Sequence, residues 1–144
     1  MKSFIKFVLV ISILAFSPKI LKAQHIDSST KNYKVVFQLS SNDSLVHKSF
    51  VKQMNNLLNA MNNVTIEVVT HGPGVEFLLN KSVYKNSIKR LTDQGVIFLV
   101  CQNTLNEKKI NTKELLWEAK VIPAGLAHII ARQSDGWSYV KVGF

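Results

Sequence analysis

Short apolar runs rich in β-branched residues alternate along this chain with stretches of helical periodicity. Residues 33–39, 64–70 and 96–101 have the composition of buried strands. Between the first two, apolar residues recur every three or four positions from about residue 44 to residue 62, which predicts an amphipathic helix. Because strands that alternate with helices form right-handed crossover units, this order predicts a parallel sheet.

The second half of the chain continues the same order. Short helices are predicted near residues 75–79 and 82–93, and brief strands over residues 120–122 and 137–142. We therefore predict an α/β fold, a three-layer open sheet that is mainly parallel, with about five strands and helices on both faces.

Two further helices are predicted from their terminal residues. Thr112 is expected to cap a short helix that ends at Trp117. Pro123 suits the first turn of a helix that precedes the last strand, and Gly136 suits its left-handed end. The apolar positions of this second helix are Leu126, Ala127, Ile129 and Ile130.

Polar segments follow three of the predicted strands, at residues 40–44, 71–74 and 101–104. In open parallel sheets, ligands bind beyond the carboxyl ends of the strands, near the point where the strand order reverses. We therefore expect these segments to form the functional rim, with Cys101 as the reactive residue. The supporting candidates are His71, Gly72, Asn103 and Thr104, and the candidates that line the cleft are Ser40, Ser41, Asn42 and Pro123.

Cys101 is the only cysteine of the chain. A single cysteine is inert packing, a reactive nucleophile or an intermolecular link. A nucleophile needs a lowered thiol pKa, which the backbone amides of Asn103 and Thr104 would supply by pointing at the sulfur. His71 would add a proton relay or a positive charge. The residues alone leave open that the thiol only packs in the core, that His71 is a turn residue, and that Asn103 and Thr104 only cap a turn.

The first residues have the pattern of a secretory signal. Lys2 and Lys6 precede an apolar stretch, residues 7–16, that is too short to span a bilayer, and Ala23 offers a cleavage point. We predict cleavage after Ala23 and a periplasmic or secreted protein with no later membrane span. An uncleaved anchor stays open, because Leu21 is larger than the residue preferred at that position.

The predicted organisation is a signal peptide over residues 1–23, a flexible lead over residues 24–32 and one α/β domain over residues 33–144. Four of the 18 basic residues lie in the signal, which leaves 14 against nine acidic residues and a net charge of +5. The lysines are scattered and no aromatic residues interleave with them, so nucleic-acid binding is not expected.

No metal or cofactor is expected either. His25, His47 and His128 lack the paired spacing of metal ligands. The glycines at positions 72 and 74 are not followed by the remaining pattern or the lysine of a phosphate-binding loop.

Three motifs in order resemble the DsrE/DsrF-like family of the sulfur-relay superfamily. They are residues 71–74 with the apolar helix behind them, residues 101–105 after the third strand, and residues 121–127, which lead to Gln133, Gly136 and Tyr139. The resemblance covers nearly the whole chain beyond the signal. It implies a compact YchN-like α/β fold, assembly into homotrimers or homohexamers, and a cysteine that carries sulfur as a persulfide, a role that falls on Cys101. The export signal departs from the cytoplasmic relays.

Two functions follow as hypotheses. The first is an exported sulfur carrier or sulfurtransferase subunit that bears a persulfide on Cys101. Because no second cysteine can resolve that persulfide, release would need a donor or acceptor protein or a small thiol. The second is a non-catalytic oligomeric module for binding or assembly that uses the strand-end cleft.

Overall fold

The computed structural model describes residues 31–143 of the chain. The predicted signal over residues 1–23 and most of the predicted lead lie outside the described residues. Within the described part, five strands form one sheet in the order β4-β3-β2-β1-β5, and every neighbouring pair is parallel. No helix of this part is long and apolar enough to cross a membrane.

All five predicted strands are present, with bounds within a residue or so of the prediction. They are β1 (Tyr33–Leu39), β2 (Val64–Thr70), β3 (Ile97–Cys101), β4 (Ala119–Ile122) and β5 (Ser138–Val142). The three central strands β1, β2 and β3 are largely buried, as expected for a parallel sheet covered on both faces. The predicted fold class is therefore confirmed.

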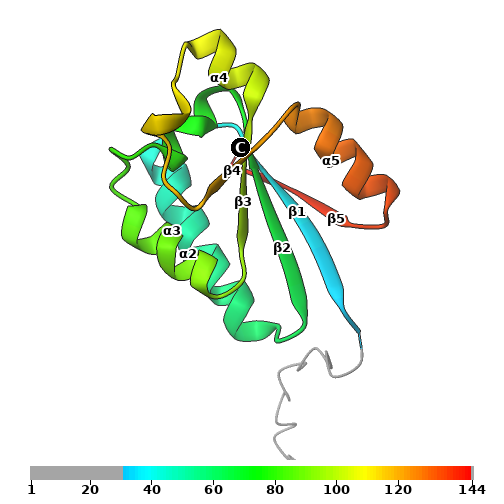
Figure 1. Ribbon diagram of the computed structural model, residues 1–144. Helices are drawn as coiled ribbons and strands as arrows, with labels where there is room; N and C mark the ends of the chain where they lie inside the picture. The colour runs from blue at the N-terminus through cyan, green and yellow to red at the C-terminus, as the bar shows by residue number, and fades with distance from the viewer. Residues whose placement is uncertain (1–30, 144) are drawn as a thin grey trace, which may run out of the picture.

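Helices cover the two faces of the sheet unequally (Figure 1). The helix α2 (Ser44–Ala60), the 3₁₀ helix η1 (Gly72–Leu78) and the helix α3 (Lys85–Asp93) pack on one face, where the larger apolar core lies. The helix α5 (Gly125–Ser134) covers the other face. Its apolar layer is small, with Val36, Val69 and Leu99 of the sheet and Ile129 of α5 as the buried members.

The helix α5 is the crossover that links the two edges of the sheet. It leaves β4 at one edge, contacts β1, β2 and β3, and leads to β5 at the opposite edge beside β1. The strand order therefore reverses between β1 and β5. Since β3 lies two strands away from β1, the rim position of Cys101 is not at this reversal, contrary to the topological expectation.

The segment after Cys101 is a helix and not only a polar turn. The helix α4 (Gln102–Lys108) begins directly after β3, with Cys101 as its N-cap residue, and ends at Lys109 in the left-handed conformation. Its apolar positions are few, so the hydrophobic periodicity that predicts helices was too weak to show it. Leu105 is nevertheless buried in the larger core and anchors the helix there.

Two of the predicted helix starts are wrong. Thr112 does not cap a helix that reaches Trp117, because Asn111 is the cap of a 3₁₀ turn, η2 (Thr112–Glu114), closed by a reciprocal bond with Glu114. Pro123 does not lie in the first turn of α5, because the N-cap of that helix is Ala124 and its first residue is Gly125.

Candidate functional site

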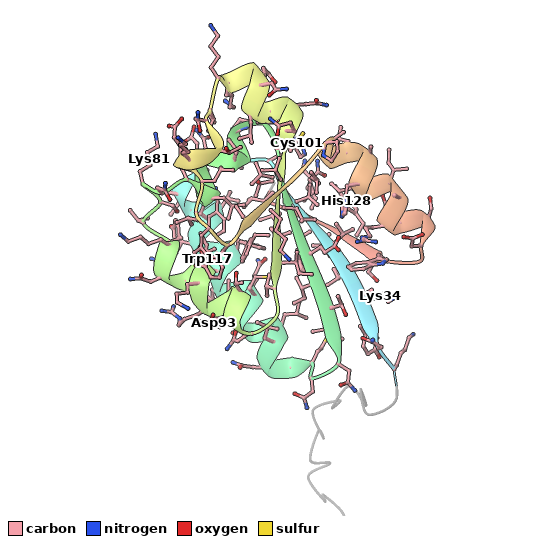
Figure 2. All side chains as sticks on the ribbon, viewed as in Figure 1. Lys34, Lys81, Asp93, Cys101, Trp117 and His128 are labelled. Atoms are coloured by element: carbon pink, nitrogen blue, oxygen red, sulfur yellow. The ribbon has the colours of Figure 1, made fainter. Side chains whose placement is uncertain are left out.

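The thiol of Cys101 lies where two helices begin. Cys101 is the last residue of β3 and the N-cap of α4, and the first residue of α5, Gly125, lies against it. Figure 2 shows Cys101 at the end of β3, beside the starts of both helices. The residue is a free cysteine and only 6% exposed.

Polar groups converge on the sulfur in spite of this burial. The backbone N–H of Gly125 donates a hydrogen bond to Cys101 Sγ at 3.2 Å. Burial alone would raise the pKa of the thiol, but the amides of Gly125, Thr104 and Asn103, together with the Thr104 hydroxyl, lower the pKa below its ordinary value. Positive helix N-termini favour an anion in the same way. The site therefore favours the thiolate.

A second glycine supports the hydroxyl that faces the thiol. The backbone N–H of Gly72 donates to Thr104 Oγ1 at 3.0 Å, which leaves the Thr104 hydroxyl hydrogen for the sulfur. Gly72 has φ +53°, a left-handed conformation that glycine adopts without cost. The turn after β2 therefore acts on the thiol indirectly, because the Gly72 N–H orients the Thr104 hydroxyl that donates to the sulfur.

His71 is a neighbour of Cys101. A Cβ built on Gly125 would lie 3.3 Å from Cys101 Cβ and 3.5 Å from His71 Cβ, so the three residues pack together. Burial lowers the pKa of His71, which makes the imidazole neutral at pH 7. The Gln38 amide lies 2.7 Å from His71 Nε2, and the Tyr139 hydroxyl donates to the Gln38 carbonyl oxygen. Because the side-chain nitrogen of Gln38 can only donate, His71 Nε2 is assigned as the acceptor and the proton of the neutral imidazole is assigned to Nδ1.

The predicted cleft-lining residues lie elsewhere in the rim. The Ser41 hydroxyl accepts from the Asp43 amide at the start of α2, and the Asn42 amide lies 3.5 Å from Glu76 of η1. Ser40 follows β1 and packs closely against Gly74, since a Cβ built on Gly74 would lie 2.9 Å from Ser40 Cα. Pro123 is exposed in the link between β4 and α5. No described contact joins any of these predicted cleft-lining residues to the thiol. In contrast, Asn103 and Thr104 donate to it, His71 packs beside it, and Gly72 contacts it only through Thr104.

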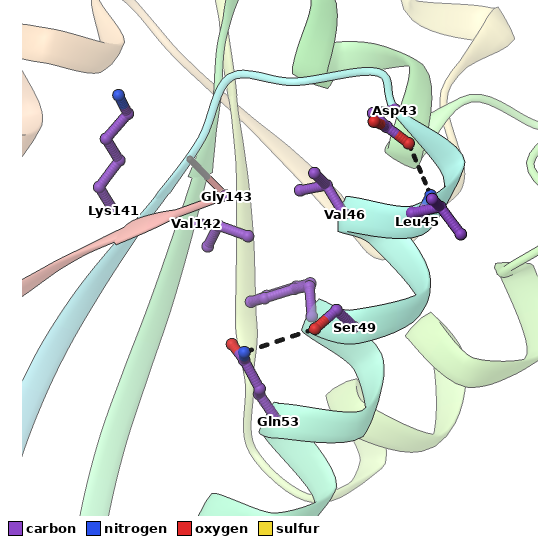
Figure 3. Close-up of a pocket in the computed structure, with 9 residues that line it drawn as sticks. Asp43, Leu45, Val46, Ser49, Gln53, Lys141, Val142 and Gly143 are labelled. Carbon is purple, nitrogen blue, oxygen red and sulfur yellow. Dashed lines mark hydrogen bonds between the residues drawn. The ribbon is translucent and has the colours of Figure 1, made fainter.

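One groove among the described residues lies away from this site. It has a volume of about 430 Å³ and lies between α2 and the edge strand β5, with Val46, Phe50 and Val142 among its lining residues (Figure 3). These side chains belong to the larger core, on the face of the sheet opposite α5. None of the predicted site residues lines the groove, so it carries no argument about the thiol.

Three residues near the thiol were missed by the sequence reasoning. Gly125 contributes a backbone amide, and no side-chain pattern marks such a donor. Gln38 and Tyr139 form the polar contacts behind His71. Gln38 is a half-buried amide between the buried Phe37 and Leu39, and this interruption of the apolar run was the available signal, because a polar side chain removed from water needs a partner.

The comparison with known families decides what the chain is. The model of the DsrE/DsrF-like family matches residues 33–142, which is nearly the whole described part. The chain belongs to the DsrE/DsrF-like family. The resemblance seen in the sequence is therefore confirmed.

Solved structures agree with this assignment. A protein of unknown function, MTH1491 from Methanobacterium thermoautotrophicum, is 35% identical to this DsrE/DsrF-like chain, with a TM-score of 0.74 over 76% of this chain and 98% of that one. The ychN protein from E. coli is 15% identical, with a TM-score of 0.61 over 78% and 99% of the two chains. The second likeness shows the fold alone. None of the curated proteins compared with the chain gives a significant match.

Proposed function

We propose that this DsrE/DsrF-like protein carries sulfane sulfur as a persulfide on Cys101. The observation that supports this role best is the set of donors around the sulfur, led by the Gly125 amide at 3.2 Å, which lowers the thiol pKa in a buried place. An inert packed cysteine needs no such donors, and burial without them raises its pKa. Family membership adds the general expectation of sulfur relay.

The loading step needs only a thiolate and a donor persulfide. The thiolate of Cys101 attacks the outer sulfur of R–S–SH. A new S–S bond forms on Cys101 while the S–S bond of the donor breaks, and the donor leaves as the thiolate R–S⁻ with the bonding electron pair. The proton stays with the transferred sulfur or is lost to solvent. The neutral imidazole of His71, which packs beside Cys101, is a candidate acceptor for it.

The burial of Cys101 suits an exported carrier. In an oxidising compartment, an open and reactive thiol is trapped as a mixed disulfide unless a partner reduces it. A thiol that is 6% exposed under the start of α5 is shielded from large disulfides. Export after cleavage at Ala23 is part of this proposal. Since the chain has no second cysteine, unloading requires an acceptor protein or a small thiol.

The test is sulfur loading of the purified protein. After incubation with a small-molecule persulfide, intact-mass spectrometry should show the mass of one added sulfur atom, removable by a reducing thiol. Cys101→Ser should abolish this addition completely, because it removes the only thiol. Thr104→Val, which keeps Cys101 but removes a hydroxyl donor, should slow the addition.

The alternative is a binding or assembly module in which Cys101 only packs. It predicts no sulfur addition to the wild-type protein and alkylation no faster than that of an ordinary buried cysteine. That result would remove the carrier role and leave the alternative.

A further inference from the structure

A buried carboxylate joins the sheet to α5. Glu67 of β2 has a side chain that is 6% exposed. Its Oε2 accepts from Arg132 Nε at 2.9 Å and lies 2.6 Å from His128 Nε2, while its Oε1 accepts from Arg132 Nη2 at 2.8 Å. Burial alone would raise the pKa of Glu67, but Arg132 and His128 outweigh it and lower the pKa, so the carboxylate is charged.

The contacts of Arg132 extend beyond Glu67. Arg132 also lies 3.6 Å from the exposed Asp135 carboxylate, and its guanidinium stacks on Trp137 at 4.8 Å from the ring centroid. We call Glu67, His128 and Arg132 the α5 clamp. His128 and Arg132 are four positions apart in α5 and therefore lie on the same face of the helix.

Little else holds α5 on the sheet. Only two residues of the helix are buried, Gly125, which has no side chain, and Ile129. Leu126 and Ile130 point away from the sheet and are 57% and 63% exposed. One apolar side chain is a weak anchor for a ten-residue helix. The α5 clamp therefore supplies much of the specific attachment.

The same helix begins over the thiol. Gly125 is the first residue of α5, it donates to Cys101 Sγ, and its backbone packs against the side chains of Cys101 and Val69. His128 of the clamp lies one turn further along the helix, as Figure 2 shows for its position on α5 relative to Cys101. A displacement of α5 would therefore uncover the thiol and remove its amide donor together.

We infer that the α5 clamp is a positioning device that holds α5 as a cover over Cys101 and thereby sets both the access to the thiol and its ionisation. The inference rests on the proposed role of Cys101 as the reactive group. Glu67, His128 and Arg132 do not touch the sulfur in any described contact, so they act through α5. Breaking a buried ion pair by removing one partner is costly, because it leaves an uncompensated charge, so the α5 clamp resists separation of α5 from the sheet.

The test uses Glu67→Gln in the full-length protein. This substitution keeps the size of the side chain but removes the charge. The rate of iodoacetamide alkylation of Cys101 is measured against pH. We expect the plateau rate at high pH to rise about tenfold, because a cover that loses one charge-assisted bond opens more often. We also expect the apparent thiol pKa to rise, by less than complete loss of the Gly125 amide would raise it, because the amide is lost for only part of the time.

Two substitutions of Arg132 keep the test decisive if Glu67→Gln folds poorly. Arg132→Gln leaves the buried Glu67 carboxylate with His128 as its other partner and should shift both quantities in the same direction. Arg132→Lys keeps the positive charge without the paired geometry and should restore part of the wild-type behaviour. Hydrogen exchange of residues 125–134 should speed up in the first variant and less in the second.

The control is an ion pair away from α5. Lys89→Gln breaks the exposed pair with Asp93 on α3, 2.9 Å in length, and should leave both alkylation parameters unchanged. Unchanged plateau rate and unchanged pKa in folded Glu67→Gln or Arg132→Gln would overturn the inference. This test can be told apart from the test of the proposed function. If the variants alter alkylation but the wild-type protein takes up no sulfur, the role of the α5 clamp is supported and the sulfur-carrier role is rejected.

Discussion

Gly125→Pro is expected to raise the pKa of the Cys101 thiol by about one to two units. The substitution removes the N–H that donates to Sγ at 3.2 Å. A hydrogen bond to a charged group contributes about 1.5–3 kcal/mol, and one pKa unit corresponds to about 1.4 kcal/mol. Because the bond favours the thiolate over the thiol, its loss should appear mainly as a shift of ionisation.

The helix geometry itself is compatible with this proline, although the proline Cδ takes the place of the amide hydrogen and must displace the sulfur, because the nitrogen lies only 3.2 Å from Sγ. Gly125 is the first residue of α5, where proline is common because that position has no intrahelical N–H bond to lose. Ala124 before it has φ −144° and ψ 113°, an extended conformation that is compatible with a following proline. Helix content measured by circular dichroism should therefore stay near the wild-type value.

Gly125→Ala is the control for crowding at the Cβ position. Its Cβ would lie 3.2 Å from Val69 Cγ1 and 3.3 Å from Cys101 Cβ, a tight contact that proline shares, but the alanine keeps the N–H donor. The pH profile of iodoacetamide alkylation should shift upward in Gly125→Pro and much less in Gly125→Ala. Equal shifts in the two variants would show that packing, and not the amide, controls the thiol.

Gly74→Ala is expected to be the most destabilising glycine substitution in the rim. A Cβ on Gly74 would lie 2.1 Å from the Leu39 carbonyl oxygen and 2.9 Å from Ser40 Cα, so backbone at the end of β1 must move. Overpacking usually costs about 1–3 kcal/mol, and displacement of backbone should place this substitution at about 3 kcal/mol or more. The free energy of unfolding in urea measures the loss.

Gly72→Ala is the comparison for this prediction. Nothing lies within 4 Å of a Cβ at Gly72, so only the left-handed conformation at φ +53° is penalised. The expected cost is about 1–2 kcal/mol. If Gly72→Ala lowered the free energy of unfolding as much as Gly74→Ala does, the close contact of Gly74 with the end of β1 would not be the cause of the destabilisation. Gly72→Asn should cost less than Gly72→Ala, since asparagine tolerates this conformation better.

The sheet could be predicted because its signal is local and strong. Apolar β-branched runs marked β1, β2 and β3 almost to the residue, and polar residues after each run marked the carboxyl end of the sheet. Cys101, His71, Gly72 and Thr104 were singled out for that reason, and the structure brings them together. Since β2 and β3 are neighbouring parallel strands, the residues that follow them lie at the same edge of the sheet, which favours this clustering.

The face of α5 could not be predicted in the same way. Its apolar residues Leu126 and Ile130 suggest a buried stripe, yet they are exposed, and the sheet-facing positions include His128 and Arg132. The reason lies in β2, where Glu67 places a carboxylate in the small core and requires polar partners from the helix above. A charge inside an apolar strand is the sequence signal that a polar helix face will cover it.

One donor at the thiol, the Gly125 amide, is also invisible to side-chain patterns. The Gly125 amide comes from a residue 24 positions away in the sequence, brought to Cys101 by the crossover of α5 over the sheet. A backbone N–H has no residue type of its own, so only the three-dimensional path of the chain places it. The sequence therefore predicts the cysteine and the Asn103 and Thr104 amides that follow it, but not the Gly125 amide.

The most direct test of the carrier role is the state of Cys101 in protein recovered from its own cells. The protein is alkylated at once on lysis, and its intact mass is measured before and after a reducing thiol. We predict a fraction of chains that is heavier by one sulfur atom, lost on reduction and absent from Cys101→Ser produced in the same cells. Recovery of every wild-type chain with a plain alkylated thiol, under conditions in which a known persulfide protein keeps its sulfur, would contradict the account.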